Sequence, residues 1–209
     1  MLITPDELLE RYQAGERNFA GLRIEANTDN PDVLYGADLS NIILSGIYWP
    51  GARLRDVNLT KAKLVGAYMP DADLTLADLT WADLNGATLR RACLECTNLT
   101  GARLEYANLI QANLEGADTR DANFEYSLLF DLDLRQIRPA GSPIDDVEIY
   151  YRFALVWNTI MPDGRFVAEP EYGTRYTSRN YTKHQPLLEL IRLPSFYEGN
   201  LESGRKILK

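Results

Sequence analysis

Hydrophobic positions recur every five residues along most of the first two thirds of the chain. Between Leu34 and Leu134, 17 of the 21 positions taken at this step are Leu. The position two residues earlier is Ala in 14 repeats, and the position directly before is Asp or Asn in 11. Upstream, Phe19 and Ile24 keep the same phase, which Asp29 breaks. The pattern predicts one continuous series of repeats, which must be recognised before any helix or strand is assigned.

A step of five residues suits neither regular element. On a helix each Leu would lie ~140° beyond the last, and on a straight strand successive leucines would point to opposite sides. A bend in every repeat instead directs every Leu to one axis, with Ala also inside and Asp or Asn outside. We therefore predict a coil wound around a stack of large side chains. The predicted axial core includes Leu34, Leu54, Leu74, Leu84, Leu94, Leu104, Leu114 and Phe124.

Four right-angle bends would close a coil of twenty residues. At this separation Tyr48 falls over Tyr68, and Tyr106 falls over Tyr126. The glycines do not decide the length, because they also fit a separation of fifteen. A further set of residues, taken at every twentieth position, favours a coil of twenty residues. Asn alternates with Asp along this row, which relieves repulsion between carboxylates stacked ~4.8 Å apart. This row contains Asp38, Asn58, Asp78, Asn98 and Asp118.

The segments ADLTL, ADLNG and ANLEG resemble the pentapeptide-repeat family, whose consensus is A-[DN]-L-x-x. The resemblance covers residues 17 to 135. It implies an all-β solenoid, a right-handed quadrilateral β-helix of five to six coils. The flanks LLERYQAGERNFAG and NTIMPDGR resemble those of family members from photosynthetic bacteria.

The ends of the repeats should carry caps, because an open β-helix leaves backbone groups unpaired. Residues 1–16 predict a capping helix, with Thr4 as N-cap, Pro5 in the first turn and Glu7 closing a capping box. Gly15 is expected to end it. The repeats are assigned to residues 17–138, and residues 139–209 to a mixed, mostly extended C-terminal extension.

Within that extension, Asp163 and Gly164 predict a turn between two strands. The segment PLLELIRL, residues 186–193, predicts a short helix. Aromatic side chains at the start of the extension are expected to cover the last coil. These are Tyr150, Tyr151, Phe153 and Trp157.

Few residues suggest catalysis. His184 is the single histidine and lies in a polar segment, where a general base would lack positioned partners. Cys93 and Cys96 form a C-x-x-C, but both fall at outward positions of one repeat, with no second pair to complete a metal site. The sequence therefore predicts no enzyme, no cofactor and no metal.

The formal net charge of −8 falls on residues 1–140, which contain 21 acidic and 13 basic side chains. This excess argues against direct nucleic-acid binding, which needs a basic surface. No segment approaches the ~20 apolar residues of a membrane span, so no membrane contact is expected. The chain begins without the basic and apolar segments of a secretory signal, which predicts a cytoplasmic protein.

The predicted function is a non-catalytic scaffold that binds an unidentified protein as a monomer or weak dimer, with a regulatory role that the resemblance suggests. Exposed aromatic side chains often anchor such contacts. As an alternative, the resemblance also implies a DNA-mimicking protein that binds DNA gyrase or another topoisomerase, which the acidic charge favours and arginines such as Arg53 and Arg91 disfavour. The predicted interaction surface contains Tyr48, Tyr68, Trp81, Tyr106 and Tyr126.

Overall fold

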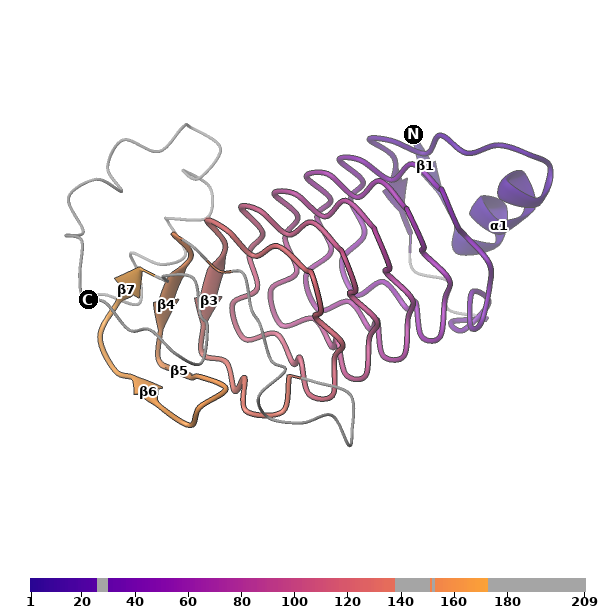
Figure 1. The fold of residues 1–209 in the computed structure, drawn as a ribbon. Helices are drawn as coiled ribbons and strands as arrows, with labels where there is room; N and C mark the ends of the chain where they lie inside the picture. Colours follow the sequence, from indigo (N-terminus) through magenta and orange to yellow (C-terminus); the bar gives the residue numbers. More distant parts are fainter. Residues whose placement is uncertain (26–29, 138–150, 152, 173–209) are drawn as a thin grey trace.

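The protein is a rod of stacked coils, with a helix at one end and a small sheet at the other (Figure 1). The computed structural model describes residues 1–25, 30–137, 151 and 153–172. The N-terminal elements are β1 (Leu2–Ile3), α1 (Pro5–Gln13) and β2 (Arg23–Ile24). The C-terminal elements are β3 (Leu128–Phe130), β4 (Leu155–Trp157), β5 (Thr159–Ile160), β6 (Phe166–Val167) and β7 (Glu171–Tyr172).

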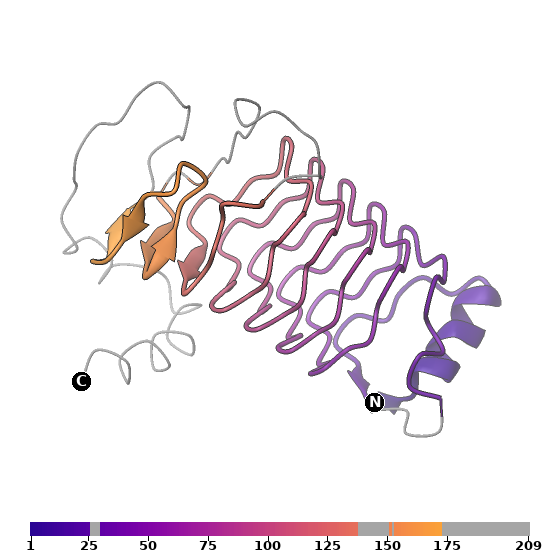
Figure 2. The same ribbon diagram turned by 90° about the horizontal axis from the view of Figure 1, so that it is seen from below.

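Between these ends, the chain forms isolated parallel bridges between residues twenty positions apart. Asp38 pairs with Asn58, Asn58 with Asp78, and the same separation continues to the bridge between Asn108 and Leu128. Turns interrupt the chain every five residues, so each coil contains four turns. The segment between two turns is too short to form a longer strand. Figure 2 shows the resulting stack from below.

Each turn contains one residue in the left-handed region. From Gly36 to Asp131, every fifth residue has a positive φ, and most of these residues are not glycine. Left-handed backbone is unfavourable for an L-residue with a side chain. Hydrogen bonds to the next coil compensate: Asp56 N donates to Thr75 O at 2.9 Å, and Lys61 N donates in the same way to the coil above. The stack, rather than glycine alone, therefore fixes the turns.

The large side chains at the five-residue positions fill the interior. Leu84 is 1% exposed, and Ala82, two residues earlier, is fully buried. Thr119, which stands at one of these positions in place of Leu, is also buried. All eight predicted axial side chains belong to one core cluster: Leu34, Leu54, Leu74, Leu84, Leu94, Leu104, Leu114 and Phe124.

Helix α1 covers the N-terminal end of this core. Thr4 Oγ1 accepts a hydrogen bond from Glu7 N at 3.2 Å, as expected of an N-cap, while Leu8 and Tyr12 are buried. The Tyr12 hydroxyl donates to Ser40 O at 2.8 Å, which attaches the helix to a coil. The helix ends at Gln13, and Gly15 follows with a φ of 100°.

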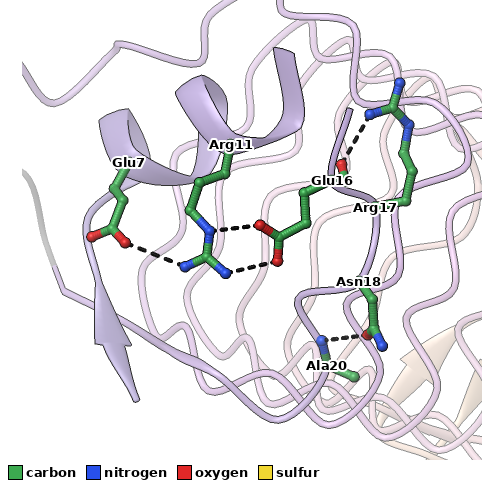
Figure 3. Close-up of polar contacts among 6 residues, drawn as sticks. All are labelled: Glu7, Arg11, Glu16, Arg17, Asn18 and Ala20. Carbon is green, nitrogen blue, oxygen red and sulfur yellow. Dashed lines mark hydrogen bonds and ion pairs between the residues drawn. The ribbon is translucent and has the colours of Figure 1, made fainter. Parts of the chain in front are cut away.

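Charged side chains hold α1 against the following segment (Figure 3). Arg11 donates to both carboxylate oxygens of Glu16, at 2.8 and 2.7 Å, and to Glu7 Oε1 at 3.2 Å. Glu7 thus pairs with Arg11, whereas the predicted capping box would direct its carboxylate to the Thr4 backbone. Next to this network, the guanidinium of Arg17 lies over the ring of Tyr12, 3.8 Å from the ring centre.

The first coil is longer than the regular coils that follow it. Arg23 pairs with Tyr48, a separation that exceeds the usual twenty positions by one repeat length. Phe19 and Ile24 are nevertheless buried in the same core cluster. One additional repeat length therefore lies between Arg23 and Tyr48, and Asp29, where the sequence pattern breaks, is outside the described residues.

The described residues between 151 and 172 continue the stack at its C-terminal end. Strand β4 pairs in parallel with β3, and β7 pairs antiparallel with β4. Tyr151 is buried in the core cluster, whereas Phe153 and Trp157 are partly buried. Strands β5 and β6 are antiparallel, with the predicted turn at Asp163 and Gly164 between them. Three predicted features lie outside the described residues: Tyr150, His184 and the helix at 186–193.

Candidate interaction surfaces

One side of the rod is a continuous sheet that joins both ends of the molecule. It runs from β1 through β2 and single bridged residues to β3, β4 and β7. We call this side the tyrosine face. Its central row consists of Leu2, Arg23, Tyr48, Tyr68, Thr88, Asn108, Leu128, Leu155 and Tyr172.

Two tyrosines form an exposed stack in the N-terminal half of the tyrosine face. The Tyr48 and Tyr68 rings lie 5.1 Å apart and nearly parallel, at 10°, and they are 40% and 44% exposed. The Arg23 guanidinium lies 4.4 Å from the Tyr48 ring centre and extends the stack. Pro50 and Val65 at the bordering turns are also exposed. The repeat pattern does not predict Arg23 at this position, because the longer first coil places it beside Tyr48.

A second stack lies along one edge of the same face. The Tyr106 and Tyr126 rings are 4.9 Å apart, and Phe153 adds a third ring 5.1 Å from Tyr126. Burial raises the pKa of Tyr106, and the neighbouring Tyr126, Glu105 and Glu125 raise it further by disfavouring a phenolate. No repeat signal places Phe153 here, since β3 and β4 pair at a separation that is not a multiple of five.

Towards its C-terminal end, the tyrosine face has buried apolar side chains in place of exposed tyrosines. Ile110, Leu128 and Phe130 are outside the axial stack, yet they are buried and form a small cluster with Leu155 and Trp157. Phe130 and Trp157 meet edge to face, with ring centres 5.9 Å apart. The accessible part of this face is therefore its N-terminal half.

Trp81 lies elsewhere, at a turn bordering the opposite side of the coil. It is 59% exposed, and one side of its ring lies against the backbone of Gly101 in the next coil. A Cβ atom at Gly101 would approach Trp81 Cε3 to 2.4 Å. The structure thus brings together four of the five predicted aromatic residues on the tyrosine face and its edge, and separates Trp81 from them.

The contact between Trp81 and Gly101 predicts a local destabilisation. We expect Gly101→Ala to cost about 1–3 kcal/mol in the free energy of unfolding, because the new methyl group overlaps the ring at a φ of +66°. Gly51→Ala is the matched control, since its φ is +64° with no atom within 4 Å of the added Cβ. Chemical denaturation measures both.

A second substitution separates the ring from the backbone effect. In the Trp81→Ala background, Gly101→Ala should cost no more than Gly51→Ala, because only the backbone penalty is left. Equal costs for Gly101→Ala and Gly51→Ala in the wild-type background would contradict the proposed contact.

The residues considered for chemistry do not assemble. Cys93 and Cys96 are free thiols; Cys93 Sγ lies 3.2 Å from Thr75 Oγ1, and Cys96 is exposed. Three aspartates at five-residue intervals occupy three different rows of the coil, so their carboxylates do not converge: Asp73, Asp78 and Asp83. Within the described part of the chain, no three His, Cys, Asp or Glu side chains gather as a metal site would require.

Ion pairs neutralise many of the carboxylates along the coil. Arg91 donates to both oxygens of Asp71 at 2.6 Å, and this hydrogen bonding holds the pKa of Asp71 below its ordinary value. Arg135 lowers the pKa of Asp133 in the same way. These exposed pairs contribute little stability individually.

The pair between Asp118 and Arg120 predicts a dependence on acid pH. A hydrogen bond from Arg120 Nε, at 2.9 Å, lowers the pKa of Asp118 in the folded protein. Such a carboxyl stabilises the fold above its unfolded pKa of ~3.9, and this contribution is lost as the pH falls through the lower folded pKa. We expect the stability of Arg120→Gln to fall less steeply with acid than that of the wild type, in urea titrations below about pH 4. Equal slopes would contradict this assignment.

No helix in the described residues is long and apolar enough to span a bilayer.

Comparisons with known proteins agree with this geometry. Eight copies of the family model for pentapeptide repeats match the chain, over residues 33–69, 52–91 and 97–136. Comparison with curated protein sequences gives no significant match.

The structure is similar to that of HetL, a pentapeptide repeat protein involved in heterocyst differentiation regulation in the cyanobacterium Nostoc sp. strain PCC 7120. The identity is 34% over 66% of this chain and 55% of HetL, with a TM-score of 0.54. The match thus spans about half of HetL. A pentapeptide repeat protein of the Arabidopsis thaliana thylakoid lumen is 30% identical over 51% of this chain and 74% of its own, with a TM-score of 0.46.

The five-residue repeats and the bridges between successive coils define a β-solenoid, a class in which each unit packs on its neighbours. The chain belongs to the pentapeptide-repeat family, and its fold is a right-handed β-helix.

Proposed function

We propose that the protein is a cytoplasmic, non-catalytic scaffold that binds a protein partner through the tyrosine face. In this proposal the β-helix is a four-sided rod whose coils hold the side chains of each face in fixed rows. The observation that supports it most strongly is the exposed stack of Tyr48 and Tyr68. Because the two rings stack on each other and Arg23 stacks on Tyr48, little side-chain entropy should be lost when a partner covers them.

The neighbours of this stack suit a protein contact. Tyr combines a large apolar ring with a hydroxyl that hydrogen-bonds at an interface. Pro50 and Val65 extend the apolar area, and Arg23 adds a charge at one end. A regulatory role is consistent with the similarity to HetL, which is described as involved in regulation of heterocyst differentiation.

Substitution of the exposed stack tests this function. We expect Tyr68→Ala to reduce capture of the partner from native lysate at least tenfold, since truncation of a central aromatic anchor typically costs about 2 kcal/mol or more. Partner recovery is measured by quantitative mass spectrometry. Lys63→Ala, an exposed change on an adjacent side, is the control and should leave recovery unchanged. Equal recovery with Tyr68→Ala and wild type would contradict a site on this face.

DNA mimicry is the alternative. It predicts that the protein alters supercoiling by DNA gyrase, which a phosphate-like array of negative charge would bind. The paired arginines disfavour it, because Arg91 and Arg103 contact Asp71 and Asp83 and interrupt such an array. Unchanged supercoiling at micromolar protein would exclude this alternative.

A further inference from the structure

A second surface lies on the side opposite the tyrosine face. Its row is displaced by ten positions, half a coil, from the row that contains Tyr48 and Tyr68. Parallel bridges connect this row without interruption from Asp38 to Asp118. We call it the aspartate face; its central row consists of Asp38, Asn58, Asp78, Asn98 and Asp118.

Carboxylates without an ion pair are concentrated on the aspartate face. Between residues 30 and 137, eight Asp and Glu side chains form no ion pair with a described residue. Two of them, Glu125 and Asp131, lie elsewhere. The other six belong to this face or its bordering turns: Asp38, Asp56, Asp78, Glu95, Glu115 and Asp121.

Basic groups on the same face and its bordering turns compensate only part of this charge. Three arginines each pair with an aspartate: Arg55 with Asp73, Arg120 with Asp118, and Arg135 with Asp133. Lys61 is the one other basic side chain on the aspartate face and its bordering turns in the described residues. The net field over the face is therefore negative, which attracts a basic partner and raises its association rate.

Large apolar side chains border the same charges. Tyr35, Leu76 and Trp81 lie at the turns beside the aspartate face and are 59%, 51% and 59% exposed. One side of the Trp81 ring lies against Gly101, and more than half of the surface of Trp81 is accessible. A tryptophan ring is the best aromatic acceptor for an Arg or Lys cation. The combination of an exposed indole ring and carboxylates without an ion pair suits an extended segment that alternates basic and apolar side chains.

We propose that the aspartate face binds a basic, extended segment of a protein, with an Arg of that segment stacked on Trp81 and its neighbours opposite Asp78, Glu95 and Glu115. The row from Asp38 to Asp118, with five stacked residues, extends roughly 20 Å, which corresponds to about six residues of an extended chain. Alternate side chains of such a chain point to the same side, so alternate residues face the carboxylates. This surface is separate from the tyrosine face, and the rod would bind two partners on opposite sides.

The probe is a fluorescein-labelled peptide of alternating Arg and Ala, titrated with the full chain and followed by fluorescence anisotropy. We expect binding that weakens as salt is raised, because exposed charges are screened. Trp81→Ala should weaken it roughly threefold to tenfold through loss of the cation–π contact. Tyr68→Ala should leave it unchanged. A peptide with Glu in place of Arg should not bind.

A pair of double variants separates this site from general attraction by an acidic protein. Glu95→Gln with Glu115→Gln removes two charges from turns bordering the aspartate face, whereas Glu25→Gln with Glu125→Gln removes two beside the tyrosine face. Only the first should weaken binding several-fold. Equal effects of the two double variants, no effect of Trp81→Ala, or no binding at low salt would each overturn the proposal. Loss of partner capture on truncating the exposed tyrosine stack tests the tyrosine face alone.

Discussion

Leu84→Ala is expected to lower the free energy of unfolding by about 2–5 kcal/mol. Leu84 lies in the middle of the axial stack and is 1% exposed. Its amide is fixed by a hydrogen bond to Arg103 O at 2.7 Å, so the backbone cannot easily move inward to fill the space. The substitution therefore removes buried apolar surface and leaves a cavity between neighbouring coils.

Leu76→Ala is the matched control, because it makes the same chemical change in the same coil at a side chain that is 51% exposed. Its effect should be within about 0.5 kcal/mol, as is usual for surface substitutions. Urea denaturation followed by circular dichroism measures both variants. Similar losses for Leu76→Ala and Leu84→Ala would contradict the assignment of leucines to a buried axis.

Leu8→Ala should have a comparably large effect, about 2–5 kcal/mol. Leu8 is fully buried and joins α1 to the same core cluster as Phe19 and Ile24. Loss of its side chain weakens the cover over the first coil, which lies at the end of the stack of coils. We therefore expect greater exposure of this end as well as lower stability, measured by denaturation and by hydrogen exchange of the Phe19 amide.

Glu10→Ala controls for changes in the helix itself. Glu10 is exposed on α1, and Ala has the highest helix propensity, so this variant should keep wild-type stability within about 0.5 kcal/mol. If Leu8→Ala behaved like Glu10→Ala, the helix would contribute nothing to closing the core.

The repeat made the coil predictable from sequence because each repeat reports the same environment. The Leu and Ala positions, the separation of twenty positions between paired rows and the pairing of Tyr48 with Tyr68 all follow from it. The left-handed backbone conformation of the turns was harder to predict. Glycine marks only a minority of the left-handed positions between Gly36 and Asp131, since hydrogen bonds from the stack impose this conformation on other residues.

The ends of the coil were not predictable in the same way. The first and last rows pair at separations other than twenty, and such pairing depends on backbone hydrogen bonds that carry no residue signature. For this reason the sequence did not place Arg23 under Tyr48 or Phe153 on Tyr126. Whether the aromatic rows are exposed also depends on the ends, as the buried cluster around Phe130 illustrates.

Both proposed surfaces depend on the same property of the fold. Each row is held by backbone pairing to its neighbours, so outward side chains are presented at fixed separations along the rod. The described side chains from residue 30 to 137 that are large, apolar and exposed lie on one of the two faces or at its bordering turns: Tyr35, Tyr48, Val65, Tyr68, Leu76, Trp81 and Tyr106.

Hydroxyl-radical footprinting of the full chain, alone and with its captured partner, tests the proposed function most directly. It reports side-chain accessibility, which suits a fold whose backbone amides are already bonded between coils. We predict protection of Tyr48 and Tyr68 by the partner, with unchanged labelling of Phe166, which is 55% exposed outside the tyrosine face. Unchanged labelling of both tyrosines in the complex would contradict binding through the tyrosine face.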